Sequence, residues 1–390
     1  MAKKYFHNFN GVRLYLACYV LMFHIEEIKY VLKYPSLYRQ YNFFEPLATS
    51  SITMFFTMSG FLISYFLFSE KMKSETSTIS LPRFYSSRVT RIWPLYFLCF
   101  ILYWIIAPNS FLQTTYNEIY FTKFFPTLNE IDISKGVYAG IFLVLLPQLA
   151  GALAFTFQGM VVYAGHFWSI GSEELFYLFW PLFVNKFKNY KKMFKYAFFA
   201  VYIWYFLLIL MVILNKLFFK NSMLNSVLAA TLSFLYLTRL YCMLIGCVFA
   251  YMYITDHRYL QFFKKNSVVA ISLISMIIML AIGLDFPIVI HEIYSLQWAV
   301  LILFLTREDI RHKWLDSKWI SYFGSITYGV YLYHVIVIIA VIVLAKYLQI
   351  SNTLYFNLFV YFFSFVCTFV VAHVSYKYYE SKFLQFKLKK

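Results

Sequence analysis

The chain has 390 residues, of which 62% are hydrophobic and only 13% are charged. A soluble globular domain is about half apolar, and the apolar residues here form many long runs, so the composition excludes an ordinary soluble protein. A formal net charge of +17 would suggest nucleic-acid binding in a soluble chain, but no DNA- or RNA-binding module is visible. The positive charge is instead explained by basic loops that fix membrane topology and contact anionic lipid.

Ten apolar runs are long enough to form helices that cross a membrane core of ~30 Å. They predict an all-α bundle of about ten transmembrane helices, forming a single membrane-embedded domain over residues 1–390 with no appended soluble domain. In chain order, the predicted helices cover residues 11–32, 46–68, 92–108, 168–185, 196–214, 227–254, 268–284, 287–306, 320–345 and 354–376.

Lys and Arg in the short loops predict the orientation of these helices, because basic loops stay in the cytoplasm. The basic segments are 69–91, 186–195, 255–265, 307–318 and the tail after residue 376. Placing all of them inside makes both termini cytoplasmic.

An eleventh apolar stretch, residues 138–164, contains Pro147 and Gly151. The topology puts the preceding residues outside and segment 186–195 inside, and the helix at 168–185 already supplies the crossing between them. The eleventh stretch is therefore predicted to be a re-entrant or partial segment, broken near Pro147 and Gly151.

Ionisable side chains inside apolar runs are costly, so each is a candidate functional residue. Arg13 and His24 are eleven residues apart in the first run, which puts them on one helix face with a rise of ~16 Å between them. Arg13 would lie at the cytoplasmic mouth and His24 near mid-membrane. The alternative is an arginine that sets topology and a histidine that hydrogen-bonds a neighbouring helix.

Arg88 and Arg91 precede the third run at a spacing of i, i+3. Two guanidinium groups on one helix face can hold a phosphate through paired hydrogen bonds. The alternative is that both serve only as cytoplasmic positive charge.

The segment that starts at His166 carries two adjacent carboxylates, Glu173 and Glu174, into an apolar run, with Tyr177 one turn beyond. A carboxylate in apolar surroundings needs a partner to stay charged. We expect Glu173 to pair with His24, since a carboxylate orients an imidazole and raises its basicity. A structural hydrogen-bond network is the alternative.

Two further polar groups lie inside later runs. Arg239 is placed well inside the predicted sixth helix and should have an anionic partner from protein or ligand. Tyr331 and His334 share a face of the predicted ninth helix, and His334 is either a second group for proton transfer or substrate binding, or a packing histidine. No His, Cys or carboxylate set has the spacing of a metal site, so no metal is predicted.

Together these segments resemble acyltransferase family 3 of membrane proteins. The resemblance runs in order from Arg13 to about Phe383 and rests on six motifs. The motifs are Arg13-x10-His24, Phe55-Phe-Thr-Met-Ser-Gly-Phe61, Arg88-x-x-Arg91 with the following Ile-Trp-Pro-Leu-Tyr, Trp168-Ser-Ile-Gly-Ser-Glu-Glu-Leu-Phe-Tyr177, Arg239 with Gly246, and Ile326-Thr-Tyr-Gly-Val-Tyr-Leu-Tyr-His334. Gly171 and Ser172 depart from the residue pair more usual at those positions.

The resemblance implies transfer of an acyl group, commonly acetyl from acetyl-CoA, to a hydroxyl of an extracytoplasmic glycan or lipid-linked sugar. The setting it implies is a multi-pass protein of a bacterial-type cytoplasmic (inner) membrane, such as one that modifies lipopolysaccharide or another surface polysaccharide. On this hypothesis His24 is the general base and Glu173 orients it. The residues expected to bind the donor are Arg13, Arg88, Arg91 and Arg239, and those expected to bind or support substrate are Ser169, Glu174, Tyr177, Tyr331 and His334.

A transporter or flippase of a lipid-linked sugar is the leading alternative, with the same polar groups lining a path for solute or protons. A structural membrane subunit is a third reading. No internal repeat is visible, which mildly disfavours transporters built from repeated halves. Dependence on acyl-CoA discriminates the enzyme from both alternatives. The sequence indicates neither the acceptor sugar nor the oligomeric state.

Overall fold

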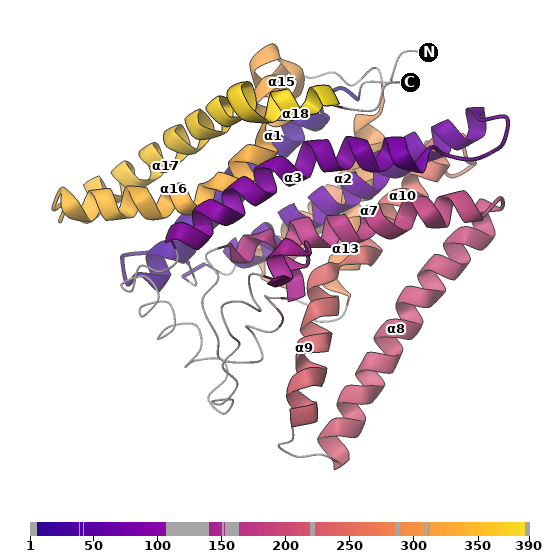
Figure 1. The fold of residues 1–390 in the computed structure, drawn as a ribbon, viewed down its shortest axis with the longest axis horizontal. Helices are drawn as coiled ribbons and strands as arrows, with labels where there is room; N and C mark the ends of the chain where they lie inside the picture. The colour runs from indigo at the N-terminus through magenta and orange to yellow at the C-terminus, as the bar shows by residue number, and fades with distance from the viewer. Residues whose placement is uncertain are drawn as a thin grey trace. The chain divides into compact units, whose positions relative to one another are not determined.

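The computed structural model describes residues 6–386 except 39, 42, 107–139, 150–151, 153–163, 219–222, 285–288, 308 and 310–312. Over these residues the chain is helical and contains no strand (Figure 1). The chain divides into two compact units, of which unit 1 comprises Met1–Phe68, Ser86–Tyr96 and Ile245–Lys390, and unit 2 comprises Ser69–Tyr85 and Phe97–Leu244. The single domain expected from the sequence stays a prediction.

Most predicted runs coincide with helices. The helices are α1 (Phe9–Val31), α2 (Phe44–Lys73), α3 (Leu81–Ile106), α7 (Trp168–Lys186), α8 (Tyr190–Phe218), α9 (Met223–Thr238), α10 (Leu240–Ile254), α11 (Leu260–Phe263), α12 (Asn266–Ala281), α13 (Ile290–Leu305), α14 (Lys313–Asp316), α15 (Lys318–Ser325), α16 (Thr327–Tyr347), α17 (Thr353–Ser375) and α18 (Ser381–Phe383). Short 3-10 turns stand at Gly165–Phe167 and Leu384–Phe386, and a π-helical turn at Tyr376–Glu380.

Two predicted helices are broken, which corrects the sequence-based boundaries. The run at 227–254 divides into α9 and α10 at Arg239, whose φ of 44° is left-handed and interrupts the helix. The run at 320–345 divides into α15 and α16 at Ile326. Both breaks fall within apolar sequence, so hydropathy does not reveal them.

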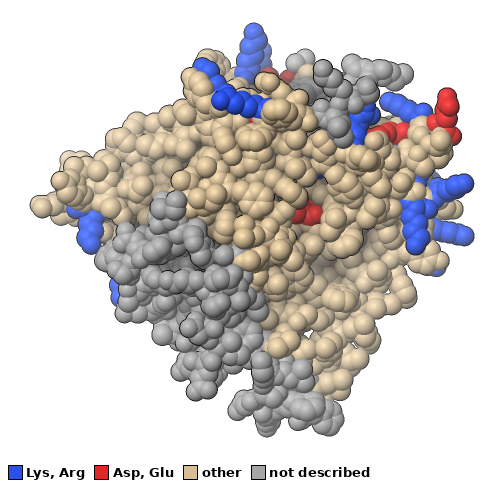
Figure 2. Space-filling model, viewed as in Figure 1, with Lys and Arg blue, Asp and Glu red and all other residues tan. Residues whose placement is uncertain are grey.

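Five helical stretches of the described residues are long and apolar enough to cross a membrane. They are Phe44–Lys73, Tyr190–Leu214, Ala230–Ile254, Thr327–Tyr347 and Thr353–Phe386. Many large apolar side chains on α8, α12 and α17 are exposed, among them Phe206 at 64% and Ile271 at 68%, and uncharged residues cover most of the face in Figure 2. Such a surface is that of an integral membrane protein. The number of ten crossings and the cytoplasmic termini stay predictions.

Most of the predicted re-entrant stretch, 138–164, lies outside the described residues. Within it, helical turns at 140–143 and 147–149 are separated by a break at which Leu145 has a φ of 60°. The break is next to Pro147, and the re-entrant path itself stays a prediction.

In unit 1, α1 and α16 run in the same direction and α17 runs back beside them. Asn10, near the start of α1, hydrogen-bonds Ser321 of α15 (3.2 Å between Nδ2 and Oγ). At this same end Tyr322 of α15 hydrogen-bonds His373 of α17 (2.6 Å). We call it the N-terminal end of unit 1, where α1 and α16 begin and α17 finishes. A Cβ on Gly324 would lie 2.0 Å from the backbone oxygen of Asn10, so only glycine allows α15 to approach α1 this closely.

Candidate active site

His24 of α1 and His334 of α16 lie side by side in unit 1, although 310 residues separate them in the chain. Their ring centroids are 4.8 Å apart and their planes are inclined by 43°. His334 is 1% exposed, whereas the side chain of His24 keeps 17% of its surface exposed. The structure thus brings together the two histidines that the sequence singled out.

Hydrogen bonds at Nδ1 define which nitrogen of each ring can act as a base. Nδ1 of His24 is 2.8 Å from Oε2 of Glu27, and Nδ1 of His334 is 2.5 Å from the backbone oxygen of Tyr331. An ionised carboxylate and a carbonyl oxygen only accept hydrogen bonds, so Nδ1 carries the proton in both rings. When neutral, each ring then presents Nε2 as its lone-pair nitrogen.

Glu27 was not predicted as a site residue. It stands three residues after His24 on α1, a spacing that brings side chains together on one helix face. That spacing is visible in the sequence, which was interpreted only through the Glu173-Glu174 pattern. Glu173 belongs to unit 2, where its Oε2 accepts a hydrogen bond from Tyr177 (2.8 Å). Its pairing with His24 stays a prediction.

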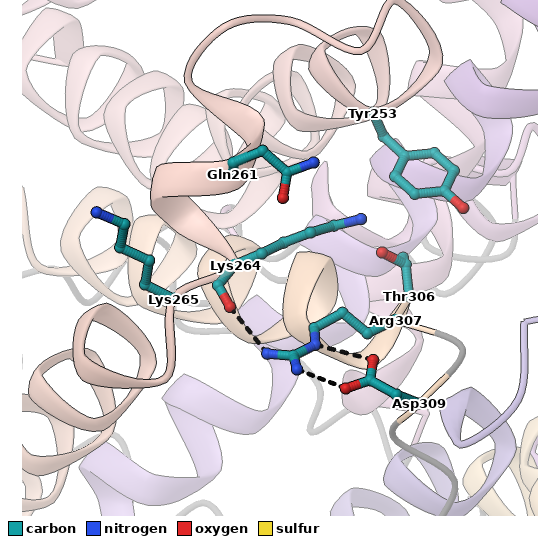
Figure 3. Close-up of a pocket in the computed structure, with 7 residues that line it drawn as sticks. All are labelled: Tyr253, Gln261, Lys264, Lys265, Thr306, Arg307 and Asp309. Carbon is teal, nitrogen blue, oxygen red and sulfur yellow. Dashed lines mark hydrogen bonds and ion pairs between the residues drawn. The ribbon is translucent and has the colours of Figure 1, made fainter.

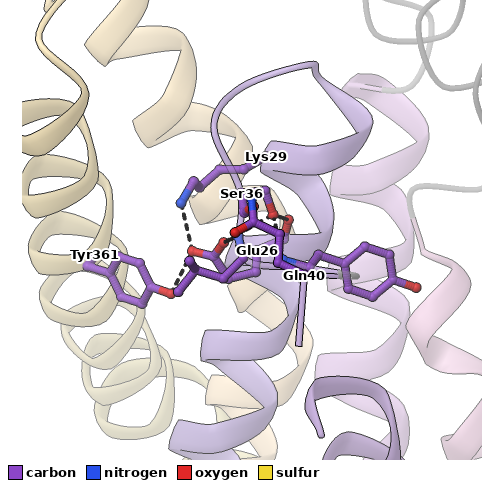
Figure 4. A network of polar contacts seen from close by, with 7 residues as sticks. Glu26, Lys29, Ser36, Gln40 and Tyr361 are labelled. Carbon is purple, nitrogen blue, oxygen red and sulfur yellow. Dashed lines mark hydrogen bonds and ion pairs between the residues drawn. The ribbon is translucent and has the colours of Figure 1, made fainter. Parts of the chain in front are cut away.

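The neighbouring carboxylate, Glu26, has a different role. It is fully buried, and it accepts hydrogen bonds from Lys29 (2.6 Å) and from Tyr361 of α17 (2.7 Å) at Oε1. Its Oε2 accepts from Ser36 Oγ (3.0 Å) and from the backbone N–H of Leu37 (2.5 Å), as Figure 4 illustrates. This network fastens the end of α1 to the segment that follows it and to α17. It thereby holds the turn that carries His24.

The predicted phosphate-binding arginines Arg13, Arg88 and Arg91 all belong to unit 1. Nη1 of Arg13 is 3.3 Å from Oδ1 of Asn10, at the N-terminal end. α3 begins at Leu81, eleven residues earlier than predicted, so Arg88 and Arg91 are one turn apart on a helix.

The part of α3 that follows these arginines is hydrogen-bonded to α16 and to the π-helical turn after α17. Tyr328 of α16 donates to the backbone oxygen of Ile92 (2.9 Å), and Tyr379 donates to that of Pro94 (3.2 Å). Tyr328 is six residues before His334, a rise of ~9 Å along α16. Arg91 is therefore placed on the same side of the histidine pair as Arg13.

The remaining predicted residues gather in unit 2. Ser169, Glu174 and Tyr177 lie on α7 with Glu173. Ser172 donates to the backbone oxygen of Leu237 (3.3 Å), which ties α7 to the end of α9 beside Arg239. A Cβ on Gly171 would lie 1.8 Å from Oε1 of Gln148, so the departure at this motif position accommodates the close packing of residues 147–148.

Arg239 is 5% exposed, and its guanidinium lies 5.0 Å from the centre of the Trp168 ring. Its Nε and Nη1 have no hydrogen-bond partner within the described part of the chain. The anionic partner expected from the sequence is not among those residues. Nor do the described residues contain a group of three His, Cys, Asp or Glu that could hold a metal.

Comparison with known proteins adds one match. The model of a family described as "Acyltransferase domain" matches residues 6–376. No curated protein and no solved structure matches the chain. The matched range contains the histidine pair of unit 1 and the Glu173 segment of unit 2.

Proposed function

Since the chain belongs to acyltransferase family 3, we propose that it transfers an acyl group, acetyl in the first instance, from cytoplasmic acyl-CoA to a hydroxyl of an extracytoplasmic glycan or lipid-linked sugar. The carrying observation is the pair of imidazoles 4.8 Å apart, with Glu27 bound to one of them. A base with its lone pair on Nε2 is what activation of a hydroxyl requires.

In this proposal Nε2 of His24 removes the proton from the acceptor hydroxyl as its oxygen attacks the thioester carbonyl carbon. The carbon–sulfur bond then breaks, and the imidazolium returns its proton to the departing CoA thiolate. Glu27 holds the ring through Nδ1 and stabilises the charge that the ring gains. His334 accepts a hydrogen bond from a further hydroxyl of the sugar, and two adjacent rings avoid carrying positive charge together.

The donor's phosphates cannot enter apolar surroundings, so they stay at the N-terminal end of unit 1. Arg13, Arg88 and Arg91 supply guanidinium groups for them. The uncharged pantetheine arm then extends along the ~16 Å rise between Arg13 and His24. In this proposal Glu27 takes the orienting role that the sequence analysis expected of Glu173, and Arg239 keeps its predicted role in donor binding.

Transfer is measured with the purified protein in lipid nanodiscs, acetyl-CoA labelled in the acetyl group, and surface glycans of cells that lack the gene as acceptor. His24→Ala should lower turnover ~10²–10⁴-fold, the usual contribution of a general base. His257→Ala, a histidine of the loop after α10, is the matched control and should keep full activity. Normal turnover by His24→Ala would remove the mechanism. A protein that moves a lipid-linked sugar without consuming acetyl-CoA would instead be a flippase.

A further inference from the structure

A basic pocket in unit 1 lies apart from the histidine pair and has no role in the proposed chemistry. Its volume is about 600 Å³, within the usual range for small-molecule sites. It is formed by α10, by α11 with the two residues after it, and by the segment that follows α13 (Figure 3). The lining residues are Tyr253, Gln261, Lys264, Lys265, Thr306, Arg307 and Asp309.

Arg307 and Asp309 form the fixed wall of this pocket. The guanidinium donates to both carboxylate oxygens of Asp309 (3.0 and 2.5 Å) and to Asn266 Oδ1 (2.8 Å). It also donates to the backbone oxygen of Lys264 (3.2 Å). The hydrogen bonds from Arg307 lower the pKa of Asp309, so this carboxylate stays ionised and paired at neutral pH. The pair neutralises itself and leaves the two lysines as the pocket's excess charge.

Lys264 and Lys265 therefore decide which ligand fits. In Figure 3 the side chain of Lys264 extends between Gln261 and Arg307 toward Tyr253, and its Nζ is 4.9 Å from the centre of that ring. Lys265 precedes the first residue of α12, a helix of 16 residues whose N-terminal end carries partial positive charge. The Lys264 ammonium, the Gln261 amide and the positive end of a helix make a site for an anion that has several oxygens, and Figure 3 shows the Lys265 side chain pointing away from them at the rim.

The position of the pocket narrows the class of anion. Tyr253 contacts Phe6, which precedes α1 (ring centroids 5.9 Å apart), so the pocket lies at the N-terminal end of unit 1. This is the end that carries Arg13, and the basic-loop pattern predicts that it faces the cytoplasm. With that orientation a ligand would meet the membrane–water interface, where lipid head groups and the proposed acyl donor both offer phosphates.

We propose that this pocket binds a phosphate group, either that of the acyl donor or that of an anionic lipid head group. Both sources offer the same chemistry to the two lysines. The assignment to the donor rests on the proposed function, whereas phosphate binding by the pocket does not.

The test uses the charge-removing variant K264Q/K265Q. K191Q/K192Q is the matched control, because it removes the same charge from two exposed lysines at the start of α8. K264R/K265R keeps the charge and should keep binding. In nanodiscs of phosphatidylcholine alone, equilibrium binding of CoA is measured with pantetheine, which has no phosphate, as the reference ligand. Loss of two charged contacts should raise the Kd of CoA about tenfold or more and leave pantetheine unchanged.

A second arm adds phosphatidylglycerol to the nanodiscs and follows the unfolding temperature. If the source is a lipid head group, phosphatidylglycerol stabilises the wild type and the control but not K264Q/K265Q, while CoA binding is unaffected. Identical behaviour of K264Q/K265Q and the control in both arms overturns the proposal. Neither arm depends on turnover, so a protein that binds CoA through these lysines but transfers no acyl group would refute the proposed function alone.

Discussion

Replacing Glu27 by Gln decides which carboxylate orients His24. The amide keeps the size of the side chain but lacks the charge that faces Nδ1 at 2.8 Å. A hydrogen bond to a charged group contributes ~1.5–3 kcal/mol, and each ~1.4 kcal/mol of lost transition-state stabilisation is a factor of ten in rate. His24 and Glu27 keep only 17% and 18% of their side-chain surfaces exposed, so solvent screens the contact in part. We expect kcat to fall by about 10- to 100-fold.

The assay compares Glu27→Gln with Glu173→Gln in the same nanodisc transfer reaction, with CoA affinity and unfolding temperature measured alongside. A residue that only orients the base should lower kcat and leave the Kd of CoA and the unfolding temperature near wild type. Should Glu27→Gln turn over at the wild-type rate while Glu173→Gln is impaired, the geometry at Nδ1 would not be the catalytic one, and Glu173 would take the orienting role.

Two further predictions concern the supports of this site. Glu26→Gln leaves the buried ammonium of Lys29 without its counter-charge, so it should destabilise the protein by ~3–5 kcal/mol. The measurement is the unfolding temperature, which should fall strongly. An unchanged unfolding temperature would mean that the network of Figure 4 does not hold α1. Gly324→Ala pushes a methyl group against the backbone of α1 and should cost ~1–3 kcal/mol. Gly165→Ala is its control, because nothing lies within 4 Å of a Cβ at that position, and equal stability of the two variants would contradict the close packing.

Most helix positions, and His24 and His334 as separate candidates, could be predicted from the sequence because each depends on local information. Apolar runs mark helices, and a histidine within such a run marks a polar site. The contact between His24 and His334 is tertiary and could not be predicted. Helical spacing nevertheless placed each histidine on a polar face of its helix, and a polar face inside a membrane bundle needs a polar partner.

The remainder of the site depends on contacts between residues that are far apart in the chain. Glu26 and Glu27 are adjacent and identical in type. Only the hydrogen bonds of Glu26 with Tyr361 and Ser36 show that Glu26 has a structural role. Likewise the left-handed φ of Arg239 was not predictable, since an arginine in an apolar run carries no signal of a helix break. Pairing and backbone geometry are decided by neighbours that are far apart in the chain.

α1 is not among the helical stretches that are apolar enough to cross a membrane by composition alone. A count of charges treats His24, Glu26, Glu27 and Lys29 as separate costs. In the structure they form two short contacts, Lys29 with Glu26 (2.6 Å) and His24 with Glu27 (2.8 Å), and Tyr361 completes the first. A paired and hydrogen-bonded group costs far less in apolar surroundings than an isolated one. The helix that carries the proposed base can thus contain more ionisable groups than its mean hydropathy suggests for a membrane helix, because these groups are paired with one another within the protein.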